Sequence, residues 1–156
     1  MGTTTIYRSQ QGFSLIELLI VVAIILIIMS IALPELMNAR MSANESAAVS
    51  NMRTIVTAET AYSVEYNQGY STQLSQLGGV GVAPSPSNAL LIDSALASGT
   101  KSGFQYIYSS TGSAFTINAN PVSLNLTGRR YFYSDQAGVI YFSYNAPAGP
   151  SDPELQ

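Results

Sequence analysis

The most constraining feature of the chain is a predominantly apolar run from Phe13 to Leu33 that contains a single charged residue, Glu17. A helix needs about 20 apolar residues to cross the hydrocarbon core of a bilayer, so this run is long enough to span a membrane. An ionised side chain inside such a segment costs roughly 2.5–3.5 kcal/mol on insertion scales. A simple anchor has no need of this carboxylate, whereas a helix that later pairs it with a cation from another copy does.

The residues around Glu17 resemble a known family. The stretch Gly12–Glu17, the apolar residues behind it and Pro34 are similar to the N-terminus of type IV prepilins and of the pseudopilins of type II secretion. In that family a prepilin peptidase cleaves after the glycine and N-methylates the next residue. The resemblance therefore implies cleavage after Gly12, N-methylation of Phe13 and a helix kink at Pro34, where a proline removes a helical hydrogen bond.

The positions of Phe13 and Glu17 agree with this resemblance. After cleavage Phe13 would carry a positive amine, and Glu17 follows four residues later, about one helical turn away. The carboxylate also lies near a helix N-terminus, where the helix dipole favours negative charge. In a bundle, Glu17 of one copy would meet the Phe13 amine of a neighbour, and a head-to-tail contact that does not close produces a helical filament. We therefore expect Phe13 and Glu17 to set the register of assembly.

Two simpler interpretations of the apolar run compete with assembly. One is an ordinary membrane anchor in which Glu17 has no partner. The other is a secretory signal peptide, for which Ser30-Ile31-Ala32 is an acceptable cleavage site. The run is longer than the usual 7 to 15 residues of such signals, and Arg8 is the leader's one positive charge. Removing the segment would also discard Glu17.

Composition excludes several classes of function. Charged residues make up 10% of the chain, and the net charge is −3, so a broad attraction to nucleic acid is not expected. The chain has no cysteine and no histidine. A Ser-His-Asp triad, a Cys-His dyad and a histidine-based metal site are therefore excluded. We predict a protein that is not an enzyme and that has no cofactor and no metal site.

The pattern along the chain predicts six segments. These are a leader (1–12), a transmembrane and assembly helix (13–34), an amphipathic continuation of that helix (35–66), an αβ-loop (67–103), a sheet (104–145) and a C-terminal tail (146–156). Apolar or small residues recur at helical spacing in the continuation and predict the stripe that faces the head; they are Met41, Ala48, Met52, Ile55, Tyr62 and Tyr66. Within the αβ-loop, Asn88–Leu96 is expected to form a short helix capped by Ser87 or Asn88.

Alternating residues after position 103 predict at least four antiparallel strands. The expected strands are 104–108, 114–118, 130–134 and 139–144, with Asp135–Gly138 as a hairpin loop. A sheet this small needs a covering element, so we expect it to pack on the helix in the α+β fold of pilins. The expected core residues of the sheet are Phe104, Ile107, Phe115, Ile117, Phe132, Ile140 and Phe142. The segment from Asn145 on is expected to be loose.

Two other clusters suggest functions that the sequence supports less well. Tyrosines crowd the predicted sheet and could stack on carbohydrate, although half-buried tyrosines are common in strands. Major pseudopilins bind calcium near the C-terminus, where this chain has Asp135, Asp152 and Glu154. Calcium requires six to eight oxygen ligands, and the spacing of these acids is not that of a known calcium loop, so no site is predicted.

The sequence therefore predicts a non-enzymatic, type IV pilin-like subunit that polymerises into a helical surface filament for adhesion, motility or DNA uptake. The resemblance implies a bacterial inner-membrane precursor with a cytoplasmic N-terminus. It implies as partners membrane lipid before assembly, further copies of the chain, a prepilin peptidase, and an inner-membrane assembly platform with its ATPase motor. The first alternative is a pseudopilin in a periplasmic pseudopilus of type II secretion. The second is a membrane-tethered binding module that does not polymerise.

Overall fold

The computed structural model describes residues 12–79, 81 and 83–155. The chain divides into two units, Met1–Leu36 and Met37–Gln156. One helix, α1 (Leu15–Tyr66), contributes to both. It begins two residues after the expected start and ends at the expected residue. Arg8 and the leader before Gly12 lie outside the described residues.

The described part of the first unit, Gly12 to Leu36, holds the beginning of α1, and every one of its residues is exposed. This part of the helix is apolar on all sides and is long enough and apolar enough to cross a membrane. A helix that is apolar all round belongs in a bilayer or inside a larger assembly. Pro34 lies inside α1 rather than at its end, and the kink at this residue stays a prediction.

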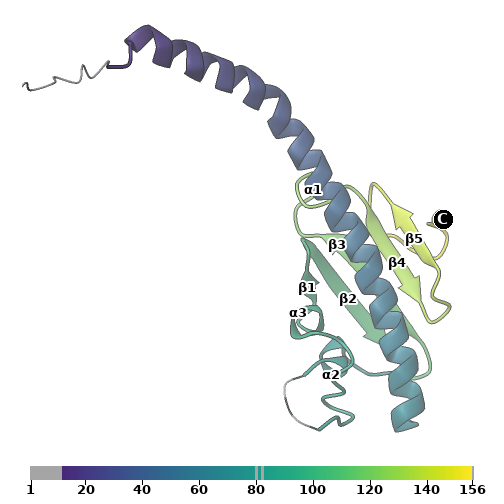
Figure 1. Ribbon diagram of the computed structural model, residues 1–156. Coiled ribbons are helices and arrows are strands. Elements are labelled where there is room, and N and C mark those ends of the chain that lie inside the picture. The colour runs from purple at the N-terminus through teal and green to yellow at the C-terminus, as the bar shows by residue number, and fades with distance from the viewer. Residues whose placement is uncertain (1–11, 80, 82, 156) are drawn as a thin grey trace, which may run out of the picture. The chain divides into compact units, whose positions relative to one another are not determined.

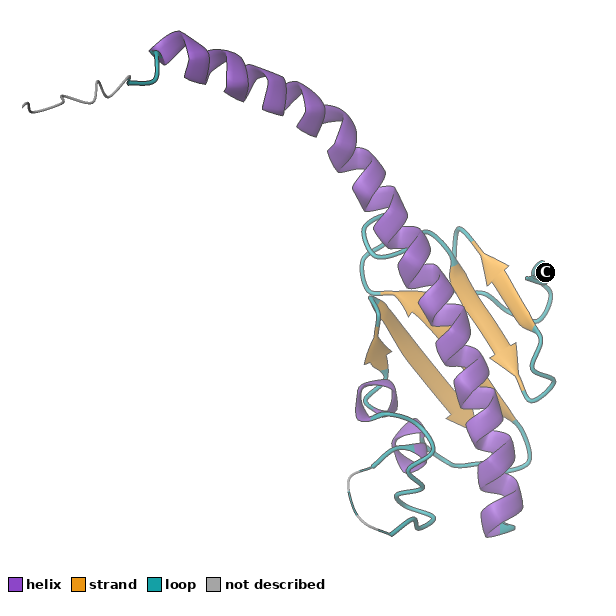
Figure 2. Cartoon of the chain, in the orientation of Figure 1, coloured by secondary structure: helices purple, strands orange, loops and turns teal. Residues whose placement is uncertain are grey.

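The second unit, which we call the head, places the rest of α1 against one face of an antiparallel sheet (Figures 1 and 2). The strands follow the order of the chain and are β1 (Thr100–Lys101), β2 (Phe104–Ser110), β3 (Phe115–Pro121), β4 (Tyr131–Asp135) and β5 (Ile140–Ser143). Two short helices, α2 (Leu74–Leu77) and α3 (Ser94–Ala97), precede the sheet. This is the expected α+β fold, with the two-residue strand β1 added to the four strands predicted.

The core lies between α1 and the sheet. The predicted helical stripe is buried at Met41, Ala48, Met52, Ile55 and Tyr62, while Tyr66 is partly buried. Ile107 contradicts the prediction because it is 50% exposed, whereas Phe104 and Tyr106 are buried. Successive side chains of a strand point to opposite faces, so Phe104 and Tyr106 share the core face and Ile107, an odd number of residues from Phe104, lies on the other. Phe142 is only partly buried.

Two local predictions in the head were wrong. The short helix of the αβ-loop is α3, which begins after Asp93, and the Asp93 side chain accepts a hydrogen bond from the backbone N–H of Leu96. The tail is not loose, because Leu155 donates its N–H to the carbonyl of Ile140 at 2.7 Å and Phe142 donates to Pro153 at 3.0 Å. β5 is an edge strand, and its unpaired backbone groups are what the tail satisfies.

Two tyrosines of β2, the buried Tyr106 and the partly buried Tyr108, link the sheet to the C-terminal half of α1. Tyr108 donates to the carbonyl of Ser71 at 2.9 Å, and Ser71 in turn donates to the buried carboxylate of Glu59. Burial and the nearby Glu59 raise the pKa of the Tyr108 hydroxyl above its ordinary value of 10.0. Burial likewise raises the pKa of Tyr106, against a smaller opposite effect of Asn51.

These tyrosines predict that the head loses stability in alkali. Above pH 10 the unfolded chain releases the phenolic protons while the folded chain keeps them, so the stabilisation is complete below pH 10 and declines as the pH rises towards the folded values. The slope should reach about 1.4 kcal/mol per pH unit for each such tyrosine. Urea unfolding between pH 8 and 12 measures it, and Tyr108→Phe should make the slope shallower. An unchanged slope in that variant would contradict the assignment.

Candidate assembly site

The start of α1 is capped by Glu17, the acidic residue of its first turn. The backbone N–H of Ser14 donates to Oε2 of Glu17 at 3.0 Å, and the carbonyl of Ser14 accepts the first helical hydrogen bond, from Leu18 at 3.2 Å. This is one half of a capping box, in which a glutamate in the first turn satisfies the N–H of the N-cap residue. We did not predict this contact, although the Ser-x-x-Glu pattern in the sequence is its signature.

The predicted assembly residues lie on the surface of the first unit. Phe13 is 83% exposed, and both Gly12 and Glu17 are exposed. Neither ion pair found among the described residues involves Glu17. The carboxylate therefore retains accessible oxygen for a cation from outside, while one oxygen holds the helix end. The structure brings Glu17 to Ser14, one residue beyond Phe13 in the same chain.

The apolar part of α1 presents a continuous apolar surface that is expected to contact lipid or protein. Between Leu15 and Leu33 its large apolar side chains are 45–81% exposed. Soluble monomers rarely expose apolar patches beyond a few hundred Å², and larger ones mark membrane or protein contacts. This surface is suited to lipid, to identical helices, or to each in turn.

Within the head, a second polar cluster links α1 to the residues just before β4. The carboxylate of Glu45 accepts hydrogen bonds from the backbone N–H groups of Arg129 and Arg130, at 2.7 and 3.1 Å, and pairs with Nε of Arg130 at 2.8 Å. The Arg130 guanidinium also lies over the rings of Phe132 and Phe142, at 5.4 and 5.6 Å from their centroids. Glu45 is buried, so it is a rigid clasp between α1 and the start of β4.

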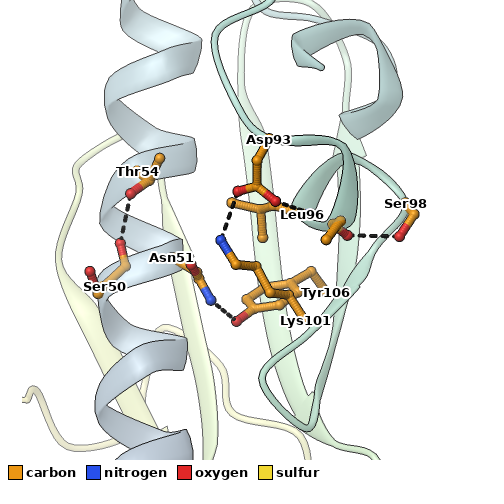
Figure 3. A network of polar contacts seen from close by, with 9 residues as sticks. Ser50, Asn51, Thr54, Asp93, Leu96, Ser98, Lys101 and Tyr106 are labelled. Carbon is orange, nitrogen blue, oxygen red and sulfur yellow. Dashed lines mark hydrogen bonds and ion pairs between the residues drawn. The ribbon is translucent and has the colours of Figure 1, made fainter. Parts of the chain in front are cut away.

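Figure 3 draws two further polar contacts, one between α1 and β2 and one between the cap of α3 and β1. Asn51 of α1 donates to the hydroxyl of Tyr106 at 2.9 Å, while Asp93 pairs with Lys101 at 2.7 Å and caps α3 (Figure 3). The hydrogen bond from Lys101, followed by that from the Leu96 backbone, lowers the pKa of Asp93 below its ordinary value. The Asp93–Lys101 pair holds the end of the αβ-loop against β1.

The acids considered for calcium have other roles. Asp135 accepts from the N–H of Ala137 in the β4–β5 turn, and Asp152 accepts from Gly149. Among the described residues, no group of three or more His, Cys, Asp or Glu side chains is arranged to hold a metal ion. Two of the sheet tyrosines, the half-buried Tyr133 and Tyr141, pair with each other at 6.1 Å between ring centroids.

Comparisons with known proteins found one family model and one similar curated protein. Residues 7–33 match the family model described as the prokaryotic N-terminal methylation motif. The chain is 35% identical over 81 residues to the type IV wide pilus major component PilA4 of Thermus thermophilus. That match covers 52% of this chain and 61% of the relative. No solved structure matches the chain significantly.

Proposed function

We propose that the chain is a type IV pilin-like protein, in the broad sense that includes the pseudopilins, and a structural subunit of a helical surface filament; its match to the prokaryotic N-terminal methylation motif and its similarity to a pilus component support this. The observation that carries the proposal is the stretch of α1 from residue 15 to residue 33, which is apolar on all sides, exposed, and charged only at Glu17 in its first turn. Such a helix is stable in a membrane as a precursor and between identical helices in a polymer.

The processing of this subunit follows from the same motif. We infer that a prepilin peptidase cleaves after Gly12 and methylates the new N-terminus at Phe13. The start of α1 at Leu15 leaves both residues outside the helix and exposed, so an enzyme can reach the bond between them. Before cleavage the precursor lies in the bacterial inner membrane with its N-terminus in the cytoplasm. An assembly platform driven by an ATPase extracts the processed subunit from the membrane.

Burial and charge contribute differently to the filament. Each large apolar side chain that is fully removed from water contributes roughly 1.5–3 kcal/mol, and α1 offers many such side chains. Lipid is also apolar, so the net gain on leaving the membrane is far smaller. Apolar burial therefore stabilises the filament against dissociation of its subunits into water. The pairing of Glu17 with a neighbouring Phe13 amine selects the register between subunits.

A pilus is favoured over a secretion pseudopilus by one finding, the similarity to a pilus component. The pseudopilin of a type II secretion system remains the alternative function. The two differ in where the polymer is found, because a pilus extends from the cell surface and a pseudopilus stays in the periplasm.

One measurement tests both the polymer and its processing. Filaments are sheared from cells, and the mass of this chain in the sheared fraction is determined. We expect a chain that begins at Phe13 and carries one added methyl group. An intact methionine start in purified filaments would contradict the processing, and a chain found only as a membrane-bound monomer would contradict the polymer.

A further inference from the structure

An exposed apolar loop lies at one end of the head. The loop between β3 and β4 (residues 122–130) carries three aliphatic side chains that are each about half exposed: Val122 (58%), Leu124 (46%) and Leu126 (54%). The turn is fixed from within, since Asn125 donates to the carbonyl of Gly128 at 2.9 Å and Leu126 donates to that of Ser123 at 3.1 Å. The three apolar groups are therefore presented by an ordered loop.

This loop is attached to the part of α1 that follows the apolar run. Asn44 donates to the carbonyl of Thr127 at 3.0 Å, and the Arg129 guanidinium donates to the side chain of Asn38 at 2.8 Å. Asn38 follows Leu33, the last residue of the run, by only five residues of continuous helix. A helix advances about 1.5 Å per residue, so the loop is held within a few turns of the point where the chain would leave the membrane.

The loop also carries a basic pair, Arg129 and Arg130, in a protein whose net charge is −3. Arg130 is paired with Glu45, whereas neither ion pair among the described residues involves Arg129. An open depression of about 240 Å³ lies beside Arg129 and is also lined by Asn38, Ser42 and the exposed Tyr144.

We propose that this surface docks the head onto the phospholipid bilayer while the precursor is anchored. We call it the basal patch and define it as Val122, Leu124, Leu126, Arg129 and Tyr144. The aliphatic side chains enter the boundary between headgroups and acyl chains, as the apolar face of interfacial helices does. Arg129 meets lipid phosphate, and Tyr144 lies at the headgroup level, where tyrosines are enriched.

The inference rests on the proposed function, because only a membrane-anchored precursor brings this surface to a bilayer. A docked head has one preferred orientation before extraction rather than rotating freely about its anchor. On assembly the patch leaves the lipid together with α1.

The absence of cysteine makes a direct test possible, because a single introduced cysteine takes a fluorophore at one known site. The full-length precursor is reconstituted into vesicles of phosphatidylethanolamine and phosphatidylglycerol. Ser123→Cys places the probe within the patch loop. Ser113→Cys is the matched control, because it lies in the β2–β3 turn at the other end of the same strand pair. We expect lipids with a quencher at the headgroup boundary to quench the Ser123→Cys probe several-fold more than the control.

Variants of the patch identify the contacts. In the Ser123→Cys protein, Leu124→Glu together with Leu126→Glu should reduce quenching to the control level, and both leucines are exposed enough for the core to remain intact. Arg129→Gln should lower quenching and remove its dependence on the phosphatidylglycerol fraction. Equal quenching of the two probes would overturn the inference. So would a Ser123→Cys probe that contacts other labelled chains instead of lipid, since a second copy would then be the occupant.

Failure of this inference is separable from failure of the proposed function. If the labelled chain is recovered in sheared filaments but its probe is never quenched by lipid, membrane docking is refuted and the filament subunit stands. If the probe is quenched in vesicles but no chain enters filaments in cells, docking is supported and the filament proposal fails.

Discussion

Replacing Glu17 with glutamine is expected to leave the precursor in the membrane and to abolish its incorporation into filaments. A glutamine at this position can still accept the hydrogen bond from the Ser14 N–H, because either Glu or Gln completes a capping box. What it loses is the charge, so the amine of a neighbouring Phe13 would be buried without a partner. Removing one member of a buried ion pair costs about 3–5 kcal/mol, which corresponds to at least a hundredfold loss of assembly.

The measurement is the ratio of this chain in the sheared fraction to that in the membrane fraction. Glu17→Ala is the companion variant, because it removes both the charge and the contact to Ser14. If the alanine variant fails while the glutamine variant assembles normally, the role of Glu17 is helix capping and the charge-pair hypothesis is wrong. If both variants retain the protein's function in cells and neither they nor the unchanged chain appear in the sheared fraction, the membrane-tethered binding module becomes the better description of the protein.

Glu45→Ala is expected to destabilise the head by about 3 kcal/mol, the largest effect on folding that we predict. The substitution removes three hydrogen bonds at once and leaves the backbone N–H groups of Arg129 and Arg130 without their acceptor. It also leaves the Arg130 guanidinium, whose side chain is 28% exposed, without its carboxylate. The remaining contact of Arg130 with water reduces the penalty relative to a fully buried pair.

Urea unfolding of the full chain in detergent measures this loss. Glu65→Ala on the same helix is the matched control, because Glu65 is exposed and should change stability by less than about 0.5 kcal/mol. Glu45→Gln should lie between them, since it keeps an acceptor for the backbone but not the charge opposite Arg130. Equal stability of the Glu45→Ala and Glu65→Ala variants would show that the clasp contributes nothing.

The fold class and the two layers could be predicted because they depend on periodicity. Apolar residues at helical spacing predicted the buried stripe of α1, and alternation predicted four of the five strands. Ile107 shows the limit of this reasoning, because hydrophobicity alone placed it in the core and only its phase relative to Phe104 excluded it. The helix of the αβ-loop was misplaced because Asp93, Ser87 and Asn88 are all acceptable N-caps by residue type.

The candidate site, like the fold, could be predicted from the sequence only in part. The sequence alone determined the membrane-competent run, the position of Glu17 within it and the motif shared with pilins, since these depend on residue type and spacing along one helix. Only the tertiary structure decided that Glu45 clasps residues 84 and 85 positions away, that the tail completes the edge of β5, and that the basal patch forms. Those contacts join segments far apart in the chain, and their partners are selected by the geometry of packing, which no local pattern records.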